Sequence, residues 1–204
     1  SMTQRAGRAG RLEPGICLHL IAKEQAERAA AQSEPEILQS DLSGLLMELL
    51  QWGCSDPAQM SWLDQPPVVN LLAAKRLLQM LGALEGERLS AQGQKMAALG
   101  NDPRLAAMLV SAKSDDEAAT AAKIAAILEE PPRMGNSDLG VAFSRNQPAW
   151  QQRNQQLLKR LNVRGGEADS SLIAPLLAGA FADRIARRRG QDGRYQLANG
   201  MGAM

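Results

Sequence analysis

The chain has 204 residues, 45% of them apolar, so it can form one medium domain or two to three small ones, each with a core. It contains 23 basic and 22 acidic residues, for a formal net charge of +1. The chain as a whole is therefore not basic, and its net charge gives no argument for a nucleic-acid partner. Aromatic residues make up only 3% and Ala and Leu predominate, a composition that favours packed helices over sheet.

The first elements predict an incomplete sheet. Residues 1–11 carry basic side chains at helical spacing, and after a turn the run 16–21 has the composition of a short strand. A lone strand cannot satisfy its backbone hydrogen bonds, so we expect its partner strands to be encoded upstream. Residues 22–32 predict a short helix or arm, and Ser33 with Glu36 fits a capping box.

Two helices and a hairpin are expected next. Apolar residues recur at helical spacing over 41–52, and Gly53 closes this helix. The Pro-Pro pair at 66–67 predicts the start of a helix that ends near Gly82. Residues 84–89 predict two very short strands around a Gly turn. This order is typical of a winged-helix module, although the pattern alone is not specific.

The next part of the chain predicts further helices with marked starts. Ser90 starts one helix, and Asp102 and Ser114 each suit an N-cap, with a proline or a capping-box Glu at the right distance. The helix that follows Ser114 is expected to end near Glu130, and another helix is expected over about 147–161.

The C-terminal part predicts a joint, a long helix and a strand. Gly165 and Gly166 predict a flexible joint, and residues 171–189 predict one amphipathic helix. At the C-terminus of this helix Arg187–Arg189 are expected to complement the helix dipole, and a nucleic-acid contact is the less favoured alternative. Residues 195–197 predict a strand that enters a tight turn, with no return strand before the chain stops. We therefore expect both ends of the chain to be truncated. The expected apolar face of the long helix comprises Ile173, Leu176, Leu177, Phe181 and Ile185.

One short motif carries candidate chemistry. Residues 4–11 read Gln-Arg-Ala-Gly-Arg-Ala-Gly-Arg, and Arg8 and Arg11 are three apart, so on a helix their guanidinium groups lie side by side. Such a pair suits the charge that develops on a phosphoryl group during transfer, and Gln4 could hold a water molecule. The alternative is a solvated basic segment or a generic nucleic-acid contact, and eight residues alone do not decide between these interpretations.

The same eight residues match every defined position of the sixth motif of the DEAH subset of DExH-box RNA helicases. Beyond Asp138 the chain departs from the general family and resembles the bacterial HrpB-type helicases. The resemblance to the general family continues at the expected distances in Pro14–Leu20, Trp62–Pro67, Leu81–Leu84, Leu89–Ala97 and Asp102–Leu109, of which the last two are highly specific. The HrpB-type features are Trp150, Gln155, Leu157, Leu161 and the run Tyr195–Gly200.

The resemblance implies a mostly α architecture in four parts. Residues 1–37 would be the remnant of a RecA-like α/β lobe, the second motor lobe, and residues 41–89 a winged helix. Residues 90–164 would form a helical ratchet-like domain, and residues 165–204 the start of a further C-terminal domain.

The resemblance also implies a function for a larger parent chain: ATP hydrolysis coupled to movement along, or unwinding of, RNA. Gln4 would position the attacking water, and Arg8 and Arg11 would contact the ATP phosphates as arginine fingers, worth ~10³–10⁵ in rate. The implied partners are RNA, ATP with Mg²⁺, and the upstream RecA-like lobes of the parent chain. This chain has no Gly-x-x-x-x-Gly-Lys loop and no acidic box, because Asp116-Glu117 lacks the histidine and the preceding strand. We therefore expect the chain alone to be inactive.

Other cations and the tryptophans leave alternatives open. Lys75, Arg76 and Arg104 could touch RNA phosphates, although exposed cations on any helix look the same. Trp52 is expected in the core and Trp62 as an interdomain anchor, while Trp150 could be either a base-stacking residue or a core residue.

The inventory of ligand residues predicts no metal site. Cys17 and Cys54 lack metal-ligand spacing and are expected to be buried reduced thiols, and the single His19 is expected to be a strand residue. No apolar run approaches the ~18 residues of a membrane span, so we expect a cytoplasmic protein without a membrane partner. The alternative function is a non-enzymatic winged-helix module that binds nucleic acid or protein, with residues 1–11 as a disordered basic arm.

Overall fold

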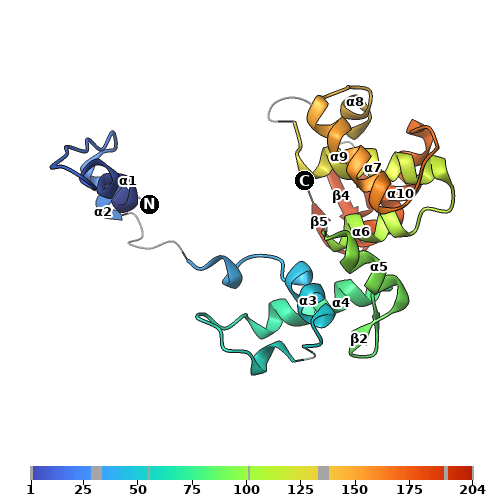
Figure 1. Cartoon of the computed structure of the whole chain (residues 1–204), viewed down its shortest axis with the longest axis horizontal. Coiled ribbons are helices and arrows are strands. Elements are labelled where there is room, and N and C mark those ends of the chain that lie inside the picture. The colour runs from blue at the N-terminus through green and yellow to red at the C-terminus, as the bar shows by residue number, and fades with distance from the viewer. Residues whose placement is uncertain are drawn as a thin grey trace. The chain divides into compact units, whose positions relative to one another are not determined.

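The computed structural model describes residues 2–28, 34–54, 56–100, 102–132, 138–190 and 193–203. It is mostly helical, which confirms the fold class at this level (Figure 1). The chain divides into two units, Ser1–Ser40 with Ser61–Pro67, and Asp41–Met60 with Val68–Met204. No helix among the described residues is long and apolar enough to cross a membrane.

The first unit contains short helices and no strand among its described residues. They are α1 (Met2–Ala9), α2 (Lys23–Arg28) and the 3-10 turn η1 (Glu36–Leu38). The strand prediction for residues 16–21 is wrong for this chain: Ile16, Leu18 and Leu20 are 90%, 83% and 100% exposed in an irregular segment. The described residues nearby supply no partner strand, so the ladder cannot form. The capping box expected at Ser33 lies outside the described residues.

The second unit begins with two helices, a hairpin and a third helix, as the sequence predicts. The glycines at 53, 82 and 86 have φ of +90°, +69° and +63°, which explains the chain reversals after α3 and α4 and within the hairpin. The elements are α3 (Ser43–Gln51), the turn η2 (Pro57–Gln59), α4 (Val68–Met80), the antiparallel pair β1 (Leu84–Glu85) and β2 (Arg88–Leu89), and α5 (Ala91–Leu99).

Helix α5 packs directly on the backbone that follows α4. The Ser90 hydroxyl accepts a hydrogen bond from the Gly93 amide at 2.9 Å and donates one to the Gly82 carbonyl at 2.7 Å. A Cβ on Gly93 would lie 2.0 Å from the Ala83 carbonyl oxygen. Only glycine therefore permits the observed approach of α5 to residue 83.

The remaining helices surround α7 (Asp115–Glu129), which contacts α6, α8, α9 and α10. The predicted caps are confirmed: the Asp102 carboxylate accepts from the Arg104 amide at 2.9 Å, and the Ser114 hydroxyl accepts from the Glu117 amide at 3.1 Å. The surrounding elements are α6 (Pro103–Val110), α8 (Leu139–Phe143), α9 (Pro148–Arg160), the turn η3 (Ser170–Leu172) and α10 (Ile173–Ala180).

The C-terminal residues correct two predictions. Residues 171–189 do not form one helix, because α10 ends at Ala180 and the turn η4 (Ala182–Arg184) leads into strand β3 (Ala186–Arg189). The chain also contains the return strand that we did not expect. Strand β4 (Arg194–Leu197) pairs antiparallel with β3 and with β5 (Gly202–Ala203), giving the order β3-β4-β5.

The Gly165-Gly166 pair is not a loose joint. Gly166 has φ of +88°, and a Cβ there would lie 2.2 Å from the Asp115 carbonyl oxygen. The next amide, that of Glu167, donates to the Asp116 carboxylate at 2.8 Å. The pair therefore packs against the first turn of α7.

The contrast between two helical glycines gives a stability test. We expect Gly93→Ala to lower the free energy of unfolding by about 1–3 kcal/mol, because its methyl group overlaps Ala83. Gly44→Ala is the matched control: Gly44 lies in α3 with nothing within 4 Å of a built Cβ. It should raise stability by about 0.5 kcal/mol through helix propensity. Urea unfolding followed by circular dichroism measures both, and equal effects of the two changes would contradict the packing argument.

Candidate functional site

The motif that suggested phosphoryl chemistry lies on and just after α1. Gln4 and Arg8 are on the helix, Arg11 is in the bend that follows it, and all three are exposed. The expectation that Arg8 and Arg11 share one helical face is wrong, because α1 ends at Ala9 between them.

The turn after α1 nevertheless folds back on the end of that helix. A Cβ on Gly15 would lie 1.9 Å from the Ala9 carbonyl oxygen, so the backbone of Gly15 touches the last residue of α1. Arg11 therefore lies in a turn anchored at both ends on the helix that carries Arg8. Arg8 and Arg11 are therefore two exposed cations on one short segment whose backbone folds back on itself, and both remain available to an anionic ligand.

The described residues provide no metal-binding cluster. No group of three or more His, Cys, Asp or Glu side chains among them is arranged to hold a metal ion. Cys17 and Cys54 are free thiols of intermediate exposure, less buried than predicted, and His19 is exposed in the irregular segment where a strand was expected.

The two neighbouring cations of α4, Lys75 and Arg76, have different surroundings. The Lys75 ammonium group donates to both carboxylate oxygens of Glu87, at 2.6 and 2.7 Å, and so ties α4 to the β1–β2 turn. Arg76 is exposed. Arg76 is thus the more accessible of the two for a phosphate ligand.

Arg104 is a buried structural cation. Its side chain is 8% exposed, and its two terminal nitrogens donate to the two Asp183 oxygens at 2.6 and 2.8 Å. One of these nitrogens also donates to the Ala180 carbonyl at 3.0 Å, and the guanidinium lies 5.3 Å from the centre of the Phe181 ring. This burial does not suit the predicted RNA contact, because the terminal nitrogens already bind Asp183 and Ala180 and the Nε is buried.

The ion pair changes the acid–base behaviour of its carboxylate. Hydrogen bonds from Arg104 lower the pKa of Asp183 from its ordinary value, and partial burial opposes this effect. The sequence contained no local signal for the pair, since its members are 79 residues apart.

The structure corrects the prediction for Trp52 and decides the open one for Trp150. Trp52 is 76% exposed at the end of α3, so its assignment to the core is wrong. Trp150 is 4% exposed, and its indole N–H donates to the Glu130 carbonyl at 2.9 Å. This hydrogen bond joins the start of α9 to the end of α7, so Trp150 is a core residue and cannot stack on a base.

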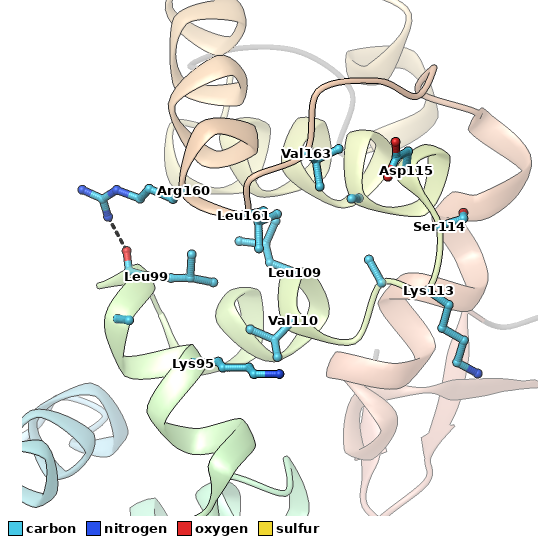
Figure 2. A pocket seen from close by; sticks show the side chains of 13 residues that line it. Lys95, Leu99, Leu109, Val110, Lys113, Ser114, Asp115, Arg160, Leu161 and Val163 are labelled. Carbon is cyan, nitrogen blue, oxygen red and sulfur yellow. Dashed lines mark hydrogen bonds between the residues drawn. The ribbon is translucent and has the colours of Figure 1, made fainter.

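A pocket of about 780 Å³ lies between α5, the α6–α7 connection and the end of α9, and Figure 2 shows the side chains that line it. Its wall combines aliphatic side chains with the charged side chains of Lys95, Lys113, Asp115 and Arg160. The Arg160 guanidinium donates a hydrogen bond to the Leu99 carbonyl. Ser114 lines it, but its hydroxyl caps α7, and no His or Cys is in the lining. The pocket therefore contains no nucleophile paired with a base.

Comparison with known proteins gives a near-identical relative. No protein-family model matches the chain. Over all 204 residues the chain is 98% identical to the ATP-dependent RNA helicase HrpB of Escherichia coli (strain K12), and it spans 25% of that protein's length. Over 120 residues, 55% of the chain, it is 34% identical to the ATP-dependent RNA helicase HrpA homolog of Haemophilus influenzae, of which it covers 9%.

Solved structures agree with the sequence comparison. A crystal structure of the Escherichia coli DEAH/RHA helicase HrpB matches the whole chain with a TM-score of 0.89 at 98% identity, over 26% of its own length. A crystal structure of the Escherichia coli DExH-box NTPase HrpB matches the whole chain with a TM-score of 0.85, over 25% of its length.

The Arg104–Asp183 pair predicts a pH-dependent stability. Asp183→Asn leaves a buried guanidinium without its counter-charge, and we expect a loss of about 3 kcal/mol at pH 7. Because the pKa of Asp183 is lowered in the folded chain, the pair stabilises above the unfolded-state pKa of about 3.9 and this contribution is lost as pH falls through the folded value. The difference in unfolding free energy between wild type and Asp183→Asn should therefore shrink below about pH 4.

Urea unfolding at pH 7, 5 and 3 measures this difference. The control is Glu87→Gln, which removes the pair with Lys75 where the Glu87 side chain is 68% exposed. It should cost less than about 1 kcal/mol. A constant difference for Asp183→Asn over the whole pH range would contradict the assignment.

Proposed function

Since the chain belongs to the DExH-box helicases of the HrpB type, we propose that it forms part of an ATP-dependent RNA helicase that couples ATP hydrolysis to movement along, or unwinding of, RNA. The chain spans about a quarter of the helicase that it matches over its whole length. The phosphate-binding loop and acidic box, which this chain lacks, would come from the upstream RecA-like lobes of the parent chain. We assign the activity to the cytoplasm.

The observation that carries this proposal is the complete helicase motif at residues 4–11, with both of its candidate finger arginines exposed. Gln4 would orient the attacking water, and Arg8 and Arg11 would bind the ATP phosphates, where their charge stabilises the transferring phosphoryl group. Mg²⁺, held by the upstream parts, would neutralise charge on the β- and γ-phosphates. Anchoring of the Arg11 turn on α1 through Gly15 supports this role, because fingers must be held in position.

The division into domains is part of the proposal. Residues 1–37 would complete the second RecA-like lobe, and the order helix, helix, hairpin, helix over 43–99 supports a winged helix at 41–89. The bundle around α7 supports a ratchet-like domain at 90–164. Residues 165–204 would begin a further domain, although α10 packs on α6 and α7 and so shares the core of the preceding helices.

The proposed RNA contacts differ in how the structure supports them. Arg76 is exposed and can bind a phosphate directly. Lys75 would first have to leave Glu87. Arg104 would act indirectly, by holding the end of α10 in place.

RNA-stimulated ATP hydrolysis by the full-length parent helicase tests the finger assignment. We expect Arg8→Ala and Arg11→Ala to lower turnover by about 10³-fold or more while RNA affinity is retained. Arg8→Lys and Arg11→Lys should also fail, because lysine cannot reproduce the planar fork of donors. Arg28→Ala is the control, since Arg28 is an exposed helical arginine of the same unit and should have no effect.

RNA binding is measured in parallel by fluorescence anisotropy. Unchanged turnover with weakened RNA binding would make Arg8 and Arg11 strand contacts and would sink the proposed catalytic role. Full activity of the lysine variants would favour the alternative, a binding module in which residues 1–11 act as a basic arm.

A further inference from the structure

The hairpin of β3 and β4 concentrates positive charge. Residues 184–203 contain five arginines and one acidic residue, in a chain whose formal net charge is +1. The four arginines on the two strands are all exposed. From the sequence, Arg187–Arg189 are expected at a helix C-terminus, so their strand geometry is not predicted.

The strand register divides these arginines between two faces. Arg187 lies opposite Gln196, and Arg189 lies opposite Arg194. Because side chains alternate along a strand and directly opposed residues share a face, Arg187, Arg189 and Arg194 lie on one face of the sheet. Arg188 lies on the other face, opposite Tyr195.

The three-arginine face carries uncompensated charge. Arg189 and Arg194 are directly opposed, and Arg187 is two residues away, about 7 Å along the strand. Like charges in directly opposed positions destabilise a strand pair. Among the residues that the structure describes, these three have no ion-pair partner, whereas Arg188 on the other face does make an interaction. An anion lying across the face would remove this repulsion.

The composition of the face defines the ligand. Its described residues are guanidinium groups, Gln196 and Gly202, with no aromatic ring on which a base could stack. The tyrosine of the hairpin, Tyr195, points to the opposite face. Arginines in a row without aromatic partners bind phosphodiester oxygens and do not distinguish bases.

We infer that the β3–β4 face formed by Arg187, Arg189 and Arg194 binds the phosphate backbone of RNA without reading its sequence. This inference rests on the proposed function, which supplies RNA as the partner, but it concerns a surface separate in the chain from residues 4–11. A protein that moves along RNA needs contacts that are equivalent at every step, and backbone contacts satisfy this requirement. Binding of each phosphate releases counterions, so removal of an arginine that binds one is visible in the salt dependence of RNA affinity.

The test measures binding of fluorescein-labelled oligouridylate and oligoadenylate to the full-length helicase over a series of KCl concentrations, without ATP. For the triple variant Arg187→Gln, Arg189→Gln and Arg194→Gln, we expect weaker binding of both RNAs. The slope of log affinity against log salt should become less steep by about 0.7 for each phosphate that the variant no longer neutralises. The triple lysine variant should keep the wild-type slope, because binding a backbone phosphate needs the charge more than the fork. Arg188→Gln, on the opposite face, is the matched control and should leave the slope unchanged.

Each outcome of this experiment supports or overturns the inference. If the triple glutamine variant keeps the wild-type slope and affinity, the inference is overturned, and an acidic protein surface becomes the candidate ligand of the face. An equal effect of Arg188→Gln overturns the assignment to one face. Thermal unfolding of each variant shows that weaker binding does not come from loss of the fold. If the wild-type protein binds no RNA, the proposed function itself fails. If Arg8→Ala abolishes ATP hydrolysis while the triple glutamine variant binds RNA normally, only this inference fails.

Discussion

Close packing around α7 is the constraint on which the helices from α6 onward depend. This helix is buried over most of its circumference, and six of its buried residues are alanines, which allow neighbouring helices to approach closely. Its buried hydroxyl, Thr120, donates to the Asp116 carbonyl at 2.7 Å and accepts from the Asp169 amide at 2.9 Å. The segment before α10 is therefore held on α7 by this hydrogen bond together with the one from the Glu167 amide to the Asp116 carboxylate. A larger side chain on α7 would displace α6, α9 or α10, since packed interiors have no spare volume.

The position of α10 in turn creates the environment of Arg104. A buried guanidinium needs a counter-charge and partners for its donors; Asp183 supplies the charge, and Asp183 and the Ala180 carbonyl accept from the two terminal nitrogens, while the buried Nε has no hydrogen-bond partner among the described residues. The carbonyl belongs to the last residue of α10, so Arg104 satisfies an acceptor that the end of a helix leaves open. The expected long helix over 171–189 stops at Ala180, where Arg104 of α6 donates to the last carbonyl, and residues 186–189 pair with β4.

The sequence predicted those features whose cause is local. Caps at Ser90, Asp102 and Ser114 and the reversal at Gly86 depend on residues within three or four positions, and all of them occur. The misses depend on distant contacts. The periodicity of 171–189 was compatible with a helix, but neither Asp183 nor strand β4 could be paired from spacing. Trp52 and Trp150 have equal intrinsic tendencies to be buried, and the packing of α9 on α7, which includes a hydrogen bond from Trp150 to the Glu130 carbonyl, distinguishes them only in the folded chain. For the proposed site, the motif predicted the residues, while the end of α1 between Arg8 and Arg11 required the structure.

Arginine serves three physical tasks in this chain, and the tasks differ in what they require of the side chain. At Arg104 the protein uses the fixed directions of the guanidinium donors, because one group must reach a carboxylate and a carbonyl at once. At Arg8 and Arg11 the proposed chemistry also needs the fork, since charge on a transferring phosphoryl group is spread over several oxygens. On the β3–β4 face only the charge is needed, because a backbone contact has no fixed partner. Substitution by lysine keeps the charge and removes the fork, so tolerance to lysine separates the last task from the other two.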